Sequence, residues 1–237
     1  MIKYDDGNYE LNEAYRSIRT YILVDESIKT ILITSSDEDE GKSTCVANIG
    51  RCFSEIEDKK TLIIDCDFRK KGINKQFEIS RNTPGLSNII YNGLTLNECI
   101  KTDGKLDILT SGTVNCNPSV LLELERTKKF INSLRNKYDY IIIDSPPVMR
   151  VNDACIIAQY VDGTVIVSAS KEIDKHEVKA TKDRLEKINA NFIGVILNKF
   201  KTKGNNIYAY YGYDDEQSKK RGLFKRKKKK FKYVASI

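Results

Sequence analysis

Six short apolar runs alternate with longer polar segments along the first 200 residues. The runs are rich in Ile, Leu and Val, and we interpret them as buried strands at 30–35, 61–65, 106–110, 140–144, 163–168 and 192–198. Between them, helical spacing of apolar residues predicts helices at 43–56, 119–136, 153–159 and 174–189. Strands that are apolar throughout favour a parallel sheet covered on both faces. The pattern therefore predicts a doubly wound α/β domain, with its ligand at the carboxyl ends of the strands.

The regular pattern ends near residue 200, and the composition then changes. We expect one domain over 1–200, a flexible arm over 201–218 and a polybasic tail over 219–237. The tail carries ten Lys or Arg and no acid, so the net charge of +7 becomes −3 for residues 1–218 (7 minus 10). A nearly neutral body with a basic end argues against a globally basic nucleic-acid-binding domain.

Several other classes of protein are disfavoured by what the sequence contains. No apolar run approaches the roughly 20 residues of a membrane-spanning helix, and no signal-peptide pattern opens the chain, so we expect a cytoplasmic protein. The six cysteines form no CxxC pair, and His176 is the single histidine. A Cys/His zinc site and a Ser-His-Asp triad are disfavoured, and we expect the thiols to be reduced core residues.

The strand predicted at 30–35 runs into a loop that ends in Gly41, Lys42, Ser43 and Thr44, before a helical segment. A strand, such a loop and a helix form the context of a P-loop. Gly41 lets backbone amides approach phosphates, Lys42 can bridge the β- and γ-phosphates, and the Ser43 hydroxyl can ligate Mg²⁺. The segment predicts binding of ATP and Mg²⁺.

The rest of this loop departs from the usual pattern. Ser36 stands where the first glycine is usual, and residues 37–40 add four carboxylates to a loop that has to hold a polyanion. Their side chains could point outward, because backbone amides make the cradle, but their field opposes ATP binding. The alternative interpretation is an acidic turn before an ordinary helix.

Two further predicted strands end in carboxylates. Asp65 closes the strand at 61–65 and Asp67 follows two residues later, so alternation along an extended chain places both on one side. Asp144 closes the strand at 140–144, as in a Walker B strand. Each aspartate alone could be a strand-end or capping carboxylate. Together with the P-loop, they indicate a Mg-nucleotide site.

A cluster of four tyrosines lies in the predicted arm, at Tyr208, Tyr210, Tyr211 and Tyr213. We interpret it as a set of phosphate acceptors, the alternative being an aromatic segment that contacts a partner. The motifs of eukaryotic-type protein kinases, Gly-x-Gly-x-x-Gly, His-Arg-Asp and Asp-Phe-Gly, do not occur in the sequence, which excludes that kinase fold.

The three motifs and the tyrosine cluster, in this order, resemble the bacterial tyrosine kinases of capsule and exopolysaccharide synthesis. The resemblance covers residues 9–213. Glu13, Arg16 and Arg19 fit the family's Glu-x-x-Arg-x-x-Arg motif, which the resemblance places on an oligomerisation helix over about 9–24, at the subunit interface of a ring. A solvated charged face is the alternative. The lack of a membrane segment fits the form in which kinase and membrane activator are separate chains.

The resemblance also implies roles for individual residues. It assigns nucleotide binding to Ser36, Glu40, Gly41, Lys42, Ser43, Thr44 and Asn198, the last of which could contact adenine. Catalysis falls to Asp65, Lys42 and Asp67, with Asp65 as the base or the positioning residue for the tyrosine hydroxyl. Mg²⁺ would be held by Ser43, Asp67 and Asp144, while Arg69 would anchor the loop after the strand at 61–65 or neutralise charge nearby. The expected reaction is autophosphorylation of the tyrosine cluster, in trans within the ring.

The chain differs from this family in the P-loop. The family usually has Pro-Gly where this chain has Glu38 and Asp39, so it lacks the residue best suited to a positive φ and a close phosphate approach. A degenerate kinase that still binds its partner is therefore an alternative.

The resemblance implies several partners: a membrane activator of the polysaccharide export machinery, a ring of identical subunits and a tyrosine phosphatase as antagonist. In the polybasic tail, cations interleave with Leu223, Phe224, Phe231 and Tyr233. This pattern suits an anionic membrane surface, which would recruit the protein to the inner face of the cell membrane, or the activator's cytosolic segment. Nucleic acid is a weaker third partner, and an inert solubilising tail is the fourth interpretation.

Two other functions are compatible with the motifs. The first is a partition- or septum-positioning ATPase of the deviant-Walker class. That class carries a signature lysine four residues before the P-loop glycine, where this chain has Asp37. The second is a non-catalytic adaptor that oligomerises and docks on a membrane partner.

Overall fold

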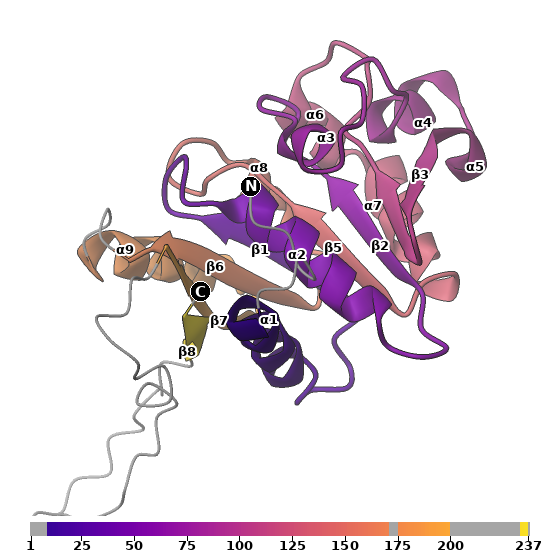
Figure 1. Ribbon diagram of the computed structural model, residues 1–237. Helices are drawn as coiled ribbons and strands as arrows, with labels where there is room; N and C mark the ends of the chain where they lie inside the picture. The colour runs from indigo at the N-terminus through magenta and orange to yellow at the C-terminus, as the bar shows by residue number, and fades with distance from the viewer. Residues whose placement is uncertain (1–8, 171–174, 200–232, 237) are drawn as a thin grey trace, which may run out of the picture.

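The computed structural model describes residues 9–170, 175–199 and 233–236 (Figure 1). In these ranges, eight strands form one sheet in the order β3-β4-β2-β5-β1-β6-β7-β8. Neighbouring strands are parallel, except that β3 runs antiparallel to β4. The strand bounds are β1 Thr30–Ser35, β2 Thr61–Asp65, β3 Ile100–Asp103, β4 Leu106–Leu109, β5 Tyr140–Asp144, β6 Gly163–Ala169, β7 Phe192–Asn198 and β8 Tyr233–Ser236.

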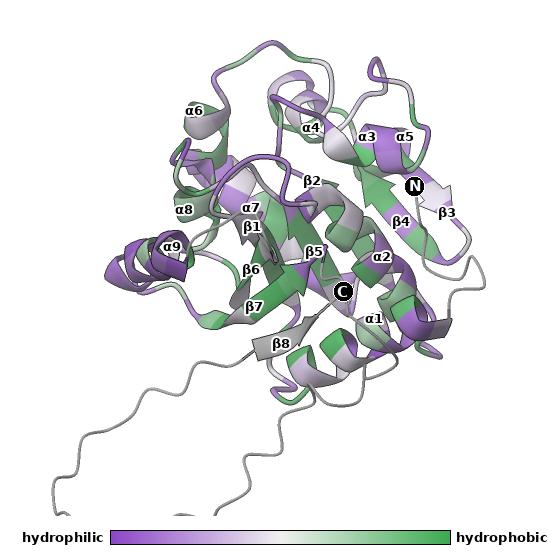
Figure 2. Cartoon of the chain, turned by 60° about the vertical axis from the view of Figure 1, so that its left-hand side comes forward, coloured by the Kyte–Doolittle hydropathy of each residue, from purple (hydrophilic) through white to green (hydrophobic). Residues whose placement is uncertain are grey.

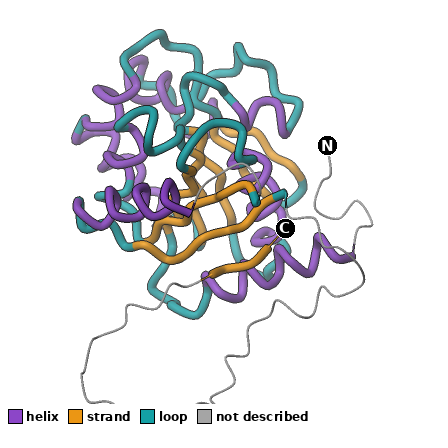
Figure 3. The backbone as a smooth tube through the Cα atoms, turned by 90° about the vertical axis from the view of Figure 1, so that its left-hand side faces the viewer, coloured by secondary structure: helices purple, strands orange, loops and turns teal. Residues whose placement is uncertain are grey.

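Helices cover both faces of this sheet (Figures 1 and 3). One face packs against α1 Tyr9–Ile22, α2 Lys42–Ser54 and α3 Gly72–Gln76. The other face packs against α4 Leu86–Asn92, α5 Leu96–Cys99, α6 Pro118–Glu123, α7 Glu125–Ser133, the 3₁₀ turn η1 Leu134–Asn136, α8 Asp153–Ile157 and α9 Lys175–Lys187. The doubly wound α/β fold predicted from the sequence is confirmed.

The central strands are apolar throughout because both of their faces are buried. In β2, Leu62 and Ile64 contact the α4–α9 side, while Ile63 contacts the α1–α3 side. All three are fully buried, and Figure 2 shows the central strands in green within the fold. Since side chains alternate along a strand, only cover on both sides makes every position apolar.

The six predicted strands are all present, but the helix predicted over 119–136 is wrong as a single element. It is broken at Leu124, whose ψ of 132° is extended, and the Thr127 hydroxyl donates to the freed Leu121 carbonyl at 2.6 Å. β3 and the short helices α3, α4 and α5 were not predicted, because elements of four to seven residues show too little periodicity. β8 was not predicted either, and it lies within the segment interpreted as polybasic tail.

The predicted N-terminal helix is confirmed as α1, which packs on α2 through Tyr15, Ile18 and Ile22. Of the part of the chain that the structure describes, no helix has the length and apolar character needed to cross a bilayer. The tyrosine cluster and residues 219–232 of the tail lie outside the described residues.

Candidate active site

The P-loop joins β1 to α2 and has the close-packed backbone that phosphate binding requires. Gly41 has φ +90°, and a Cβ atom at this position would lie 2.1 Å from Asn198 Nδ2. The Asn198 side chain, at the end of β7, donates to the Glu40 carbonyl at 2.8 Å. Asn198 thus supports the P-loop backbone; its predicted contact with adenine stays a prediction. A side chain at residue 41 would have to displace Asn198, and the positive φ also favours glycine, so Gly41 allows this close packing of the P-loop against the end of β7.

Ser43, Asp65 and Asp144 meet at the carboxyl edge of the sheet, below the start of α2. The Ser43 hydroxyl donates to Asp144 Oδ2 at 2.6 Å, and Asp65 pairs with Asp144 in register on the neighbouring strand. Two carboxylate oxygens, Asp65 Oδ2 and Asp144 Oδ1, are buried without a hydrogen-bond partner. Orphaned anionic oxygens beside a serine hydroxyl fit Mg²⁺ and its waters.

This oxygen set suits a metal that is shared with phosphate. In the described ranges, no group of three or more His, Cys, Asp or Glu side chains is arranged to hold a metal ion. Mg²⁺ is usually held through one or two carboxylates together with substrate phosphates and waters rather than by a protein cage. The residues present therefore fit Mg²⁺ bound together with a nucleotide.

The two buried carboxyls compete for charge. Burial raises the pKa of Asp144 to about 7, against the opposing effects of the Ser43 hydrogen bond and the Lys42 charge. Burial, with the nearby Asp144 and Asp67, raises the pKa of Asp65 well above its usual value. Ionising both buried carboxyls at once is unfavourable unless a cation lies beside them. A carboxyl with a raised pKa next to a phosphate site is suited to accept a proton.

Asp67 and Arg69 organise the loop after β2. Asp67 Oδ1 accepts from the backbone amides of Arg69 at 3.2 Å and Lys70 at 3.0 Å, so this carboxylate holds the turn. Arg69 Nη2 lies 3.2 Å from a carboxylate oxygen of the buried Asp153. The predicted anchoring role of Arg69 thus has a specific partner on α8. Asp153 was not predicted as a site residue; its place at the start of the helix predicted over 153–159 was the available signal.

Gly72, the first residue of α3, was likewise not predicted as a site residue. A Cβ atom here would lie 2.2 Å from Ser43 Oγ and 3.8 Å from Asp144 Oδ2. The absence of a side chain therefore lets α3 lie directly against the Ser43–Asp144 pair. No motif considered in the sequence analysis extends to this position.

The remaining predicted P-loop residues make contacts within the protein. Ser36 is buried and accepts from the Thr181 hydroxyl of α9 at 2.8 Å. Thr44 accepts from the Gln76 side chain of α3 at 3.0 Å. Lys42 is buried at the start of α2. These contacts fix the loop between helices from opposite faces of the sheet.

The four P-loop acids have two different surroundings. Glu40 points inward, where its carboxylate accepts from the amides of Asp37 at 2.7 Å and Ala169 at 3.3 Å, and burial raises its pKa. Asp37, Glu38 and Asp39 point outward, as the sequence analysis allowed, and pair with cations of the flanking loops.

Asp39 occupies the position of the family's glycine and has φ +58°. This conformation costs a side chain free energy that glycine avoids. We expect Asp39→Gly to raise the free energy of unfolding by up to about 1 kcal/mol, because the lost ion pair of an 87% exposed carboxylate contributes little. The variant should also bind Mg-ADP more tightly, since one carboxylate is removed from the phosphate site.

Asp58, at φ +57° and outside the P-loop, offers a matched control. Asp58→Gly should affect stability in a similar way and leave Mg-ADP affinity unchanged. Chemical denaturation and calorimetric titration measure the two effects. Weaker Mg-ADP binding by Asp39→Gly would contradict the expectation.

The predicted interface motif lies on α1 beside the end of α2. Arg16 pairs with Glu13 at 2.8 Å along the helix, while Arg19 lies 3.7 Å from Glu55 and donates to the Cys52 carbonyl. Pairing along a helix, which the spacing allowed, is confirmed. The role of these residues in a ring interface stays a prediction.

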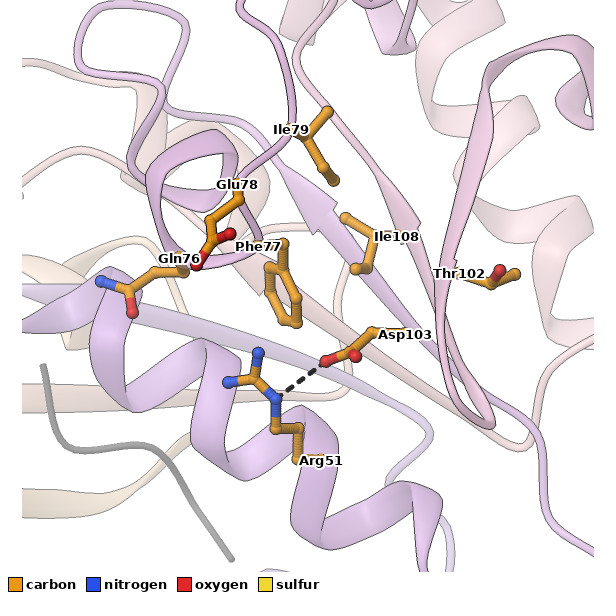
Figure 4. A pocket seen from close by; sticks show the side chains of 8 residues that line it. All are labelled: Arg51, Gln76, Phe77, Glu78, Ile79, Thr102, Asp103 and Ile108. Carbon is orange, nitrogen blue, oxygen red and sulfur yellow. Dashed lines mark hydrogen bonds and ion pairs between the residues drawn. The ribbon is translucent and has the colours of Figure 1, made fainter. Parts of the chain in front are cut away.

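A cavity of about 220 Å³ lies away from the P-loop, between the end of α2, the segment after α3 and the β3–β4 hairpin (Figure 4). In it, Arg51 pairs with Asp103 at 2.9 Å and stacks over Phe77 at 4.4 Å. The residues that line the cavity include none of the predicted site residues. It therefore does not form part of the candidate active site.

The motifs and the sheet together define a P-loop ATPase, and comparison with known proteins agrees. The family model described as "AAA domain" matches residues 28–197. Tyrosine-protein kinase YwqD of Bacillus subtilis (strain 168) is 34% identical over 209 residues, which cover 86% of this chain and 87% of that protein. The crystal structure of the chimerical protein CapA2B2 has a TM-score of 0.78 and 33% identity, covering 84% of this chain and 88% of that chain.

Within the P-loop ATPases, this chain belongs to the bacterial tyrosine-protein kinase family. The septum site-determining protein MinD of Pyrococcus horikoshii, solved with Mg-ADP, has a TM-score of 0.61 at 22% identity, covering 73% of this chain and 71% of that chain. At that identity the likeness shows a shared fold alone. The family resemblance drawn from the sequence motifs is confirmed.

Proposed function

We propose that this chain binds Mg-ATP and transfers the γ-phosphoryl group to Tyr208, Tyr210, Tyr211 and Tyr213 of a neighbouring copy. The observation that carries the proposal is the Ser43–Asp144 hydrogen bond beside two buried, unpartnered carboxylate oxygens, at the start of the P-loop helix. Family membership adds the tyrosine as acceptor.

In this proposal, the chain's own residues supply positioning, charge and a base. The P-loop amides and Lys42 bind the phosphates and draw charge from the γ-phosphoryl group. Asp65 accepts the proton of the tyrosine hydroxyl, for which its raised pKa is suited. Ser43, Asp67 and Asp144 would hold Mg²⁺, which when bound neutralises charge on the phosphate oxygens.

The arm is long enough for transfer between subunits. The tyrosines follow residue 200 by 8–13 residues, which span about 25–45 Å when extended. We include in the proposal a ring held through Glu13, Arg16 and Arg19, and a membrane activator of polysaccharide export that recruits the protein to the inner face of the cell membrane. The polybasic tail would contact anionic lipid, and a tyrosine phosphatase would reverse the reaction. Capsule or exopolysaccharide synthesis would be the regulated pathway.

The decisive experiment is intact-mass and phosphotyrosine analysis of the purified protein with Mg-ATP. We expect mass added in steps of one phosphate, and no added mass in Lys42→Met or in a variant with all four tyrosines replaced by Phe. The assay is repeated with the activator's cytosolic segment. No added mass under either condition would favour the alternative of an ATP-binding switch or adaptor.

A mixture of two inactive variants tests transfer between subunits. Lys42→Met retains the tyrosines but lacks the phosphate-binding lysine, whereas the four-Phe variant retains the lysine without acceptors. We expect phosphate to appear on the Lys42→Met chain in the mixture alone. Failure of transfer in a mixture of otherwise folded variants argues against the trans reaction.

A further inference from the structure

Each outward-facing P-loop carboxylate lies beside a cation from a flanking loop. Arg150, after β5, donates to both oxygens of Asp37, from Nε at 2.6 Å and from Nη2 at 2.7 Å. Lys70, after β2, lies with its Nζ atom 2.9 Å from Glu38 and 3.1 Å from Asp39. The same two loops follow the strands that carry the catalytic-site aspartates. The acidic P-loop is thus held from both sides by basic residues.

We propose that Arg150 and Lys70 are positioning residues for nucleotide binding, acting on the P-loop acids rather than on the nucleotide. The inference rests on the proposed binding of Mg-ATP. Three ionised carboxylates beside a polyphosphate would repel it, and two paired cations reduce the local net charge from −3 to −1. The pairs also tie the loop to the turns that follow β5 and β2.

Both cations are held by contacts that do not involve a nucleotide. The Lys70 amide donates to Asp67 Oδ1 at 3.0 Å, and the Lys70 carbonyl accepts from Arg81 at 2.8 Å. The Arg150 amide donates to the Pro147 carbonyl at 3.2 Å. Their side chains are therefore presented to the P-loop by fixed turns.

The Arg150 contact has the geometry of a strong pair on an exposed surface. Its two donors meet both carboxylate oxygens, which fits the planar fork of a guanidinium. The Arg150 hydrogen bonds lower the pKa of Asp37 to about 2, so the carboxylate is ionised throughout the neutral range. The Arg150 and Asp37 side chains are 59% and 40% exposed, and salt should therefore weaken the attraction between them.

The test measures Mg-ADP affinity by calorimetry at low and high ionic strength. We expect Arg150→Ala to weaken binding about fivefold at about 0.05 M salt, and less than about twofold at about 0.5 M. Lys70→Ala should act in the same direction, and Arg150→Lys should restore part of the affinity. Lys59→Ala is the control: it removes the same charge from an exposed pair with Asp139, at the opposite edge of the sheet, and should change nothing.

The same substitution in an Asp37→Asn background separates the proposed role from direct contact. With the carboxylate gone, Arg150→Ala should no longer weaken Mg-ADP binding. An equal loss of affinity in the wild-type and Asp37→Asn backgrounds would show that Arg150 contacts the nucleotide. Unchanged affinity in the wild-type background would show that Arg150 does not contribute to nucleotide binding. Either result overturns the inference. A wild-type protein that fails to bind Mg-ADP would overturn the proposed function, and this inference with it.

Discussion

Replacing Asp65 by Asn is expected to lower the rate of tyrosine phosphorylation by about 10²–10⁴-fold, the usual contribution of a positioned general base. The substitution keeps the shape of the side chain, and its amide oxygen can still accept from the Asp67 backbone amide, now at 2.9 Å from Asp65 Oδ1. The loop after β2 should therefore keep its conformation. Phosphotyrosine formation with Mg-ATP, followed over time, measures the loss.

Two comparisons make this result specific to the reaction. Mg-ADP affinity of Asp65→Asn should stay within about threefold of wild type, because the P-loop and Ser43 are unchanged. Asp139→Asn changes an aspartate at the amino edge of the sheet, next to β5 and far from the P-loop edge, and should leave the rate unchanged. A full rate for Asp65→Asn would remove Asp65 as the base.

The sheet and its ligand edge could be predicted because one physical cause produces the whole pattern. Strands buried on both faces must be apolar at every position, as Leu62, Ile63 and Ile64 are. In a parallel sheet the residues that follow such strands gather at one edge. Asp65 and Asp144 were therefore both expected at this edge, because each closes a predicted strand, although 79 residues separate them in the chain.

The partners of the P-loop acids could not be predicted in the same way. Arg150 lies 113 residues from Asp37, and Lys70 lies 31 residues from Asp39. Both cations follow buried strands, but an exposed cation has many possible partners, and no periodicity selects one of them. The contact of Gly72 with Ser43 likewise depends on where a five-residue helix packs. The sequence therefore located the acids, and only the fold showed how their charge is compensated.

Replacing Asp144 by Asn should stabilise the nucleotide-free protein and reduce its dependence on pH. The folded-state pKa of Asp144 is raised to about 7 from a model-compound value of 3.8, chiefly by burial. The folded protein therefore binds a proton that the unfolded chain releases, and stability falls as pH rises from about 4 to about 7. Three pH units at 1.36 kcal/mol each make this loss at most about 4 kcal/mol.

Urea denaturation between about pH 4.5 and pH 7.5 measures this effect. We expect Asp144→Asn to unfold at a higher urea concentration than wild type near pH 7. Its free energy of unfolding should also fall less steeply with pH, and the remaining pH dependence comes from Asp65 and Glu40, whose pKa values are also raised. Asp139→Asn should keep the full slope, because the pKa of Asp139 is lowered and its titration lies below this range. Bound Mg-ADP should make the free energy of unfolding of the wild type less dependent on pH, since a cation beside Asp144 favours its ionised form. An Asp144→Asn variant with the wild-type slope would mean that the carboxyl is ionised in the folded protein, and that the buried pair is already compensated without a metal.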